Sequence, residues 1–282
     1  MKTRIIAGAV LVLLLVICLF WLPLIFTAIV FALLSALAAY ELLWSTGLCR
    51  EPRLVVYSMV MAAIIPIFYY FAVHNGIANS GAYVLLGIIA FMIAMFGEMM
   101  ASHVRLQFEK IAYCFVAGLL LPFLFAGLIR IHAGYCGRYL VIIPFVIAFA
   151  SDSGAYFAGR FFGKTKLAPV ISPKKTVEGM VGGMISAVVF LLIYCLIMRY
   201  GFDFKANYGY AVIYGIVGSA AGVFGDLCFS VIKRQTGIKD YGKLIPGHGG
   251  ALDRFDSMML VAPLTEALLA IFPLLEITEI IW

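Results

Sequence analysis

Acidic and basic residues gather in one short stretch near the C-terminus of a chain that is otherwise strongly apolar. Between residues 226 and 256 stand Asp226, Lys233, Arg234, Lys239, Asp240, Lys243, His248, Asp253, Arg254 and Asp256. Hard divalent cations such as Mg²⁺ are held by one or two carboxylates together with water and substrate phosphates. Lys and Arg side chains bind phosphate oxygens. The mixture of charges therefore indicates a site for a metal ion and a polyphosphate.

The spacing of these residues predicts how helices present them. If the preceding apolar helix continues through the stretch, Asp226, Ser230 and Lys233 share one face. Asp253 and Asp256 share a face if the next helix begins near them. An unpartnered carboxylate inside an apolar helix is costly, which favours a functional role for Asp226 over a purely structural one.

Two loops supply groups that suit an anion. Gly249 and Gly250, with Gly242 and Gly247, allow backbone N–H groups to turn toward a phosphate. Lys174 and Lys175 stand just before another apolar helix, whose N-terminal dipole also favours anions. Basic loops are also ordinary in membrane proteins because anionic lipids attract them. Ser151 and Asp152 are expected to cap the end of a further helix near the same site.

The composition predicts the elements that position these residues. Of 282 residues, 65% are hydrophobic and 12% charged, about half the charged fraction of a soluble domain. A helix of roughly 20 apolar residues spans a bilayer core. Nine such spans are predicted: 5–21, 23–44, 54–73, 82–100, 111–130, 139–159, 177–198, 209–232 and 257–278. We expect an all-α polytopic membrane bundle forming one domain, 1–282, with apolar helices in 1–135 and catalytic helices and loops in 136–282.

The Lys and Arg residues predict the orientation of the bundle. With the N-terminus in the cytoplasm, most of them fall on the cytoplasmic side, leaving outside only Arg130, Arg138, Arg199 and Lys205. The positive-inside rule therefore favours an N-in, C-out topology with the charged stretch facing the cytoplasm. The first apolar run lacks a small-residue cleavage pattern, so a cleaved signal peptide is not expected. A bacterial inner (plasma) membrane suits this pattern.

Some polar and small residues have simpler interpretations. Glu41 and Glu98 are carboxylates at membrane depth, which are costly and usually functional. Both lie near the cytoplasmic ends of their predicted helices, however, so the favoured interpretation is that they reach water. Glycines at positions 215, 218 and 222 are expected to allow close helix packing, whereas Gly225 could equally make room for a ligand. The six cysteines show no metal-like spacing, and we assign them no chemistry.

The stretch from Ser230 to Asp256 resembles the signature of the phosphatidate cytidylyltransferases, and residues 151–179 resemble the block that precedes it. The resemblance covers roughly residues 145 to 275. One departure is Ser153, where the family more often has threonine. The resemblance implies condensation of CTP with phosphatidic acid to give CDP-diacylglycerol and pyrophosphate, with Mg²⁺ required and no nucleic acid partner.

The same resemblance implies roles for individual residues. Asp226 and Asp253 match the metal-binding acids and are expected to hold one or two Mg²⁺ ions, with Asp256 either a third ligand or a partner of the ligands. The polar signature residues are matched by Ser230, Lys233, Arg234, Lys239, Asp240, His248, Arg254 and Asp256. We expect Lys233, Arg234, Lys239 and Lys243 to contact the triphosphate, and Arg254, Lys174 and Lys175 the phosphatidate headgroup or the nucleotide.

Two alternatives stay open. A transporter would use Asp226, Glu41 and Glu98 along an ion path, but it predicts acids spread through the membrane depth. A related membrane transferase acting on another lipid, such as an isoprenoid phosphate, would share the loop chemistry. A homodimer through the glycine-lined helices is a further expectation.

Overall fold

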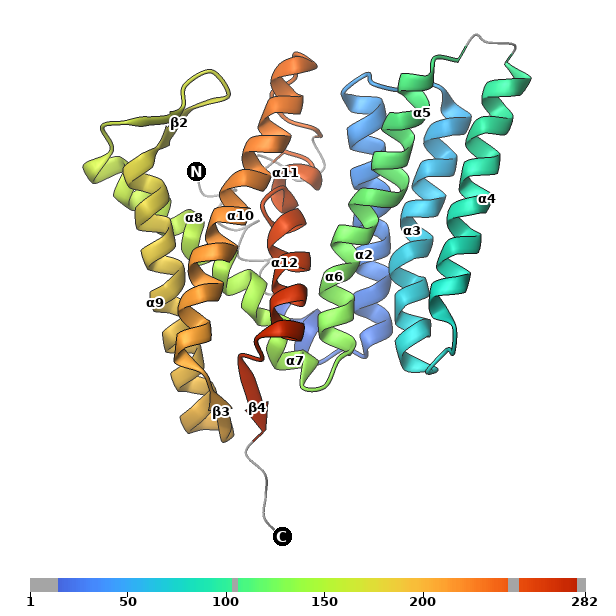
Figure 1. The fold of residues 1–282 in the computed structure, drawn as a ribbon. Helices are drawn as coiled ribbons and strands as arrows, with labels where there is room; N and C mark the ends of the chain where they lie inside the picture. Colours follow the sequence, from blue (N-terminus) through green and yellow to red (C-terminus); the bar gives the residue numbers. More distant parts are fainter. Residues whose placement is uncertain (1–14, 103–105, 243–248, 278–282) are drawn as a thin grey trace. The chain divides into compact units, whose positions relative to one another are not determined.

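The chain is mostly helical in a computed structural model that describes residues 15–102, 106–242 and 249–277 (Figure 1). The long helices are α2 (Leu24–Tyr40), α3 (Pro52–His74), α4 (Ser80–Ala101), α6 (Leu121–Ala133), α8 (Ile142–Phe162), α9 (Val177–Phe202), α10 (Tyr208–Gln235) and α12 (Met258–Ile271). Shorter helices are α5 (Phe108–Phe115), α7 (Gly137–Leu140) and α11 (Leu252–Phe255), and π-helical turns are η1 (Glu41–Ser45) and η2 (Val116–Leu120). The strands are β1 (Lys166–Ala168), β2 (Ser172–Thr176), β3 (Phe204–Ala206) and β4 (Leu275–Ile277).

Seven helices among the described residues are long and apolar enough to cross a membrane. They coincide with the predicted spans from 23–44 through 209–232, which confirms the expectation of an all-α polytopic bundle. The predicted span 5–21 lies mostly outside the described residues. The span 257–278 is wrong in extent, because α12 ends at Ile271 after 14 residues. Pro273 disfavours a further helical turn, and the chain then enters β4, which pairs with β3. The N-in orientation stays a prediction.

The chain divides into two compact units, which are described separately below. The first is formed by residues 1–138 and 233–255, and the second by residues 139–232 and 256–282. Helix α10 contributes to both, since the boundary falls between Ile232 and Lys233. The expectation of a single domain stays a prediction.

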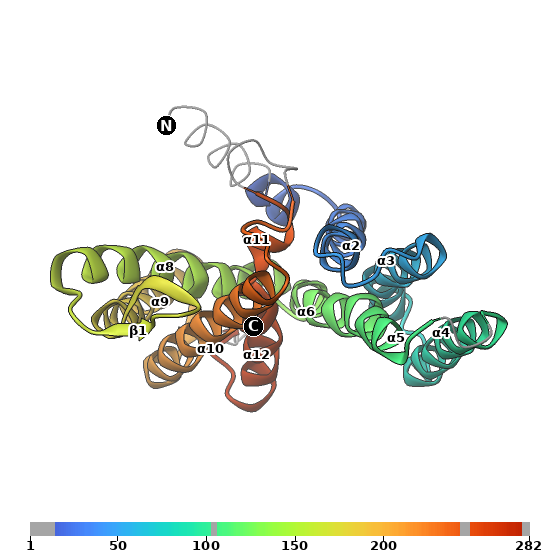
Figure 2. The ribbon, with the colours of Figure 1, turned by 90° about the horizontal axis from the view of Figure 1, so that it is seen from above.

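The core of the first unit lies where α2, α3 and the continuous helix α5–η2–α6 pack together (Figure 2). Phe31, Leu54 and Phe125 are almost completely buried there. Both π-helical turns occur in this unit, one of them starting at Glu41. Such turns are rare and often mark functional positions in helices.

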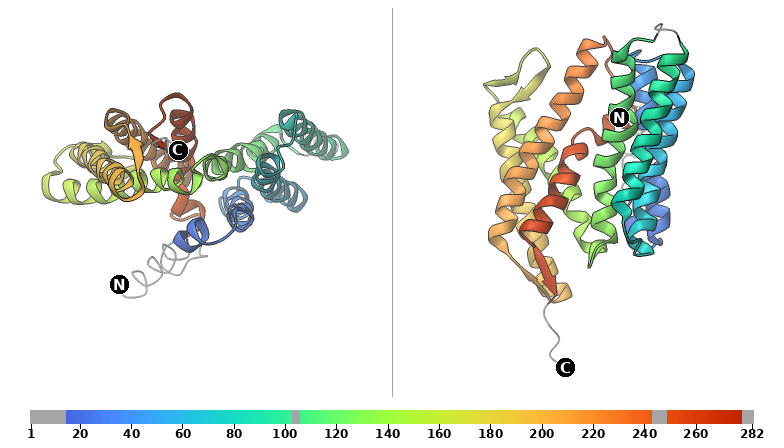
Figure 3. Two further views of the ribbon diagram at one scale, coloured as in Figure 1. Left: turned by 90° about the horizontal axis from the view of Figure 1, so that it is seen from below. Right: turned by 45° about the vertical axis from the view of Figure 1, so that its right-hand side comes forward.

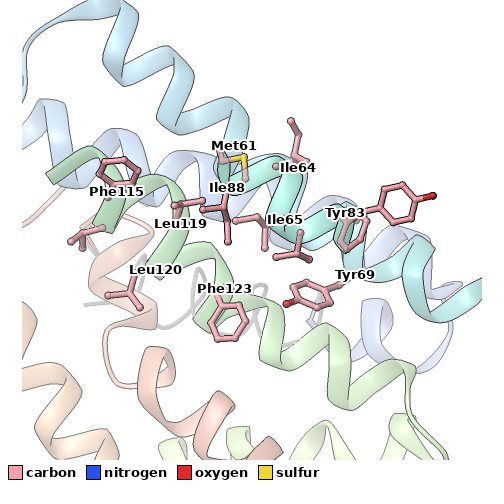
Figure 4. A pocket seen from close by; sticks show the side chains of 14 residues that line it. Met61, Ile64, Ile65, Tyr69, Tyr83, Ile88, Phe115, Leu119, Leu120 and Phe123 are labelled. Atoms are coloured by element: carbon pink, nitrogen blue, oxygen red, sulfur yellow. The ribbon is translucent and has the colours of Figure 1, made fainter. Parts of the chain in front are cut away.

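An apolar cavity of about 440 Å³ lies within the first unit, between α3, α4 and the α5–η2–α6 helix (Figure 4). Ile65, Tyr69, Ile88, Phe115 and Phe123 are among its lining residues, and none of the lining residues is charged. A cavity without cations cannot neutralise a triphosphate. The phosphate chemistry must therefore be sought elsewhere.

In the second unit, α8 and α9 pack extensively against each other. Glycines permit this close packing: a Cβ placed on Gly183 would lie 2.8 Å from the backbone oxygen of Ser151. A Cβ on Gly215 of α10 would lie 2.7 Å from Cα of Val188 in α9. Gly218 and Gly222 similarly face neighbouring side chains. The predicted packing role of Gly215, Gly218 and Gly222 is therefore confirmed.

Two small antiparallel ribbons complete the second unit. Strands β1 and β2 form a hairpin between α8 and α9, with Lys166 opposite Thr176. Strand β4, which follows α12, pairs with β3 in the register Lys205 to Glu276 (Figure 3). The first of these ribbons carries the basic residues 174 and 175.

Candidate active site

The second unit contains a carboxylate and a lysine that approach each other from different elements. Asp226 lies on α10, and its carboxylate forms an ion pair with Lys175 of strand β2. Each of these two side chains is 28% exposed. The basic loop and the charged helix, which the sequence linked only through charge, are therefore brought together. Lys174 is exposed on the same strand.

Local hydrogen bonds hold the β1–β2 hairpin in place beside the start of α9. Thr176 caps this helix by accepting the backbone N–H of Gly179 at 3.1 Å. The Glu178 carboxylate accepts the backbone N–H groups of Lys164 and Thr165, each at 3.1 Å. Sequence reasoning missed Glu178, although an acid in the first turn of a helix is a familiar stabilising pattern. These contacts fix the strand that presents Lys175.

The first unit contains a second carboxylate–lysine pair, which is far more buried. Asp253 of α11 accepts Nζ of Lys233 at 2.9 Å through Oδ1. Its other oxygen, Oδ2, accepts the backbone N–H groups of Tyr241 at 2.7 Å and Gly250 at 3.0 Å. Only 3% of the Asp253 side chain and 13% of the Lys233 side chain are exposed. Asp253 thus joins α10 to both segments that flank residues 243–248.

Glu41 contacts the same charged stretch from helix α2 and its π-helical extension. Its two carboxylate oxygens accept the backbone N–H groups of Ala251 at 3.0 Å and Leu252 at 2.8 Å. Glu41 is 2% exposed, so the expectation that it simply reaches water is wrong. The other acid, Glu98, remains partly exposed and contacts Tyr57 and Arg53.

Ser151 and Asp152 lie in the middle of α8 and not at its end, so the predicted cap is wrong. The helix continues to Phe162, because the small residues after Asp152 pack closely against α9: a Cβ on Gly154 would meet Ser186. Ser151 is 4% exposed and its hydroxyl bonds Ser219 at 3.1 Å, whereas Asp152 is exposed. Substrate contacts by Ser151 and Asp152 stay predictions.

The remaining predicted residues differ in their surroundings. Helix α10 continues to Gln235, as the predicted common face of Asp226, Ser230 and Lys233 requires. Asp256 lies in the turn after α11 and accepts the backbone N–H of Ser257 at 2.8 Å. The expected common helix face of Asp253 and Asp256 is therefore wrong, because α11 ends at Phe255.

The charged residues that flank the buried pair are mostly at the surface, and one glycine of the loop is conformationally restricted. Exposed residues are Arg234, Lys239, Asp240 and Arg254.

Gly249 has a φ of +86°, a backbone conformation that disfavours other residues at this position. Two roles were open for Gly225, close packing and room for a ligand. The structure shows close packing, because a Cβ on Gly225 would lie 2.8 Å from the backbone oxygen of Asp256. Lys243 and His248 lie outside the described residues.

The donor groups can be tested against the requirements of Mg²⁺. Among the described residues, no group of three or more His, Cys, Asp or Glu side chains could enclose a metal ion. Mg²⁺ typically needs only one or two protein carboxylates, since water and substrate phosphates complete its shell. Asp226 fits this pattern, because its carboxylate is partly exposed and contacts one lysine. Asp253 fits less well, because both of its oxygens already accept hydrogen bonds.

The long apolar helices are those of a polytopic membrane protein, and lysines pair with Asp226 and Asp253 at the charged residues that the sequence singled out. The model of the cytidylyltransferase family matches residues 2–272. A phosphatidate cytidylyltransferase of Haemophilus influenzae is 42% identical over 155 residues, covering 53% of this chain and 54% of that protein. Those of Staphylococcus haemolyticus and Staphylococcus aureus are 38% and 39% identical, each covering 66% of this chain and 69% of the relative. The chain belongs to the cytidylyltransferase family.

Proposed function

We propose that the chain catalyses the reaction for which its relatives are named, the transfer of a cytidylyl group from CTP to phosphatidate. The products are CDP-diacylglycerol and pyrophosphate. The observation that carries the proposal is the family match across residues 2–272, a range that includes the Asp226–Lys175 and Asp253–Lys233 pairs. The membrane-spanning helices suit a substrate whose acyl chains stay in a bilayer.

The chemistry of the reaction explains why charged residues suffice. An oxygen of the phosphatidate monoester attacks the α-phosphorus of CTP, and a new P–O bond forms there. The bond between the α-phosphorus and the bridging oxygen breaks, and pyrophosphate leaves with its electron pair. A phosphate monoester is largely dianionic at neutral pH, because its second pKa is about 6, so no general base is required. The protein must position two anions and neutralise their charge.

The Asp226–Lys175 pair is proposed to contribute directly to this neutralisation. Lys175 and the exposed Lys174 would contact phosphate oxygens, and Asp226 would hold Mg²⁺. When bound, Mg²⁺ would withdraw charge from the phosphate oxygens. The support for this assignment is that both side chains of the pair are partly exposed and belong to elements fixed by their own hydrogen bonds.

We call residues 233–242 and 249–255, which belong to the first unit, the signature segment. This segment is proposed to bind the nucleotide or the phosphatidate headgroup through its exposed cations, Arg234, Lys239 and Arg254. Asp253 is proposed to keep this segment in shape, in addition to any metal contact. We also propose that the site faces the cytoplasm at the plasma membrane, because the positive residues are concentrated in its loops.

Nucleotide turnover by the purified protein tests the proposal. Pyrophosphate release is measured in lipid vesicles with phosphatidic acid and Mg²⁺, comparing CTP with ATP, GTP and UTP. The expected result is release that is specific for CTP, requires phosphatidic acid and stops when EDTA is added. Turnover with an isoprenoid phosphate in place of phosphatidic acid would favour the related transferase. No turnover by folded protein with any lipid phosphate would contradict a nucleotidyltransferase function.

A further inference from the structure

Glu41 is the buried carboxylate for which the proposed reaction has no direct use. It lies at the end of α2, where the helix passes into the π-helical turn η1. Its side chain is almost completely enclosed, with 2% of the residue exposed. A buried carboxylate is retained only when strong partners compensate for the loss of water.

The partners of Glu41 are backbone groups of the signature segment. Its two oxygens accept the N–H groups of Ala251 and Leu252, which are 210 and 211 residues away in the sequence. These residues directly precede Asp253, whose own carboxylate accepts the N–H groups of Tyr241 and Gly250. Two carboxylates therefore bind consecutive backbone N–H groups, at residues 250 to 252.

Two glycines of the segment leave room for the Glu41 carboxylate. A Cβ on Gly242 or on Gly250 would clash with its oxygens. Gly242 and Gly250 also face each other, since a Cβ on Gly242 would lie 3.0 Å from Cα of Gly250. The carboxylate thus occupies the space beside the two glycines, where any larger residue would displace it. The predicted anion-binding glycines serve, at these two positions, to admit a carboxylate of the protein itself.

We propose that Glu41 is a positioning residue that holds the signature segment in its reactive conformation through Ala251 and Leu252. Its effect on the reaction is indirect, because it fixes the backbone next to Asp253 and Arg254. This inference rests on the proposed function. It adds a residue of the N-terminal helices, outside the signature, to the machinery of the reaction.

The substitution Glu41→Gln tests the proposal with little change in shape. A glutamine keeps one acceptor oxygen, but its amide donor would face a second N–H donor, so one of the two hydrogen bonds is lost. We expect kcat/KM for CTP to fall about tenfold to a hundredfold per folded molecule, the range for a lost hydrogen bond to a charged group. Phosphatidate-dependent pyrophosphate release is measured, together with Tm in the same vesicles.

Glu98→Gln is the matched control, since Glu98 is another carboxylate on a long helix of the same unit and contacts Tyr57 and Arg53 instead. We expect it to keep kcat/KM within about twofold of wild type, as for a partly exposed polar contact. A Glu41→Gln protein with wild-type kcat/KM, or equal losses in both variants, would overturn the proposal. Wild-type protein without CTP turnover would instead contradict the proposed function.

A double-mutant cycle separates positioning from a general loss of stability. Gly250→Ala places a methyl group against the Glu41 carboxylate and should disturb the same hydrogen bonds that Glu41→Gln weakens. On a logarithmic scale, the loss of kcat/KM in the double variant should therefore be much smaller than the sum of the two single losses. Glu98→Gln and Gly250→Ala should combine additively. Additive effects of Glu41→Gln and Gly250→Ala would overturn the proposal. If Glu41→Gln does not fold, Gly242→Ala replaces it, and wild-type kcat/KM in that variant is the contradicting result.

Discussion

The Asp226–Lys175 and Asp253–Lys233 pairs have the same chemical composition and very different surroundings. In the second unit, Asp226 and Lys175 are each 28% exposed. In the first unit, Asp253 is 3% exposed and accepts two backbone N–H groups in addition to Lys233. A carboxylate with a single partly exposed partner can exchange that partner for a ligand. A buried carboxylate with three donors is part of the architecture.

We propose that this difference reflects separate tasks for two residues that the sequence treats as equivalent. Asp226 and Asp253 were both predicted as metal ligands, because both match the metal-binding acids of the family that the sequence resembles. The surroundings favour Asp226 as the ligand and Asp253 as the residue that shapes the segment. Substitutions at the two positions should therefore affect different measurements.

The largest effect on stability is expected for Asp253→Asn. It leaves the Lys233 ammonium buried without its partner, which costs about 3 to 5 kcal/mol. We expect a large fall in Tm, measured by thermal unfolding in vesicles. In the double variant Asp253→Asn with Lys233→Met, no buried charge is left unpaired, so part of the lost Tm should be regained. We expect this double variant to remain inactive. An unchanged Tm in Asp253→Asn would contradict the architectural role.

The largest effect on activity without loss of stability is expected for Asp226→Asn. Its ion pair is partly exposed and contributes at most about 1 kcal/mol, so Tm should stay close to wild type. CTP turnover should fall about a hundredfold or more, as when a group that stabilises phosphate charge is removed. The measurement is pyrophosphate release per folded molecule. Activity near wild type, or a Tm as low as that of Asp253→Asn, would remove the distinction between the two sites.

A moderate effect is expected for Gly225→Ala, which tests how closely α10 packs on the turn after α11. The new Cβ would lie 2.8 Å from the backbone oxygen of Asp256, and such overpacking costs about 1 to 3 kcal/mol. Gly201→Ala on α9 is the matched control, because nothing lies within 4 Å of its Cβ. Thermal unfolding should therefore show a lower Tm only for Gly225→Ala. Equal Tm values for Gly225→Ala and Gly201→Ala would contradict close packing of Gly225 on the backbone of Asp256.

The smallest effect is expected for Ser151→Ala, which removes the hydrogen bond to Ser219. The free energy of unfolding should fall by about 1 kcal/mol, and this is measured by denaturant titration. The exposed Ser153→Ala is the control. A tenfold loss of CTP turnover in Ser151→Ala at unchanged stability would instead support the predicted substrate contact of Ser151.

Much of this arrangement follows from local patterns in the sequence. Apolar runs of about 20 residues predicted the spans from 23–44 through 209–232, because hydropathy is a local property. The basic loop before residue 177 was linked to Asp226 by charge alone, and the Lys175–Asp226 ion pair agrees with that link. The packing role of the α10 glycines followed from their spacing.

Other features depend on contacts that no local pattern contains. Glu41 meets its partners across 210 residues of sequence, so only the general rule that buried carboxylates are costly pointed to it. Ser151 and Asp152 were mistaken for the end of a helix. Their helix, α8, continues beyond them because it packs closely against α9, and no local pattern in the sequence contains that contact. The shortened α12 depends on the pairing of β4 with β3.

The assignment of Asp226 as the ligand-binding carboxylate is tested most directly by the thermal stability of wild type and Asp226→Asn, each with CTP and either Mg²⁺ or EDTA. A ligand that binds only the folded protein raises Tm, and at saturation we expect a rise of about 3 °C or more for wild type with Mg²⁺. We expect no such rise for Asp226→Asn. An equal rise in both proteins would contradict the assignment, because the metal and nucleotide would then bind without Asp226.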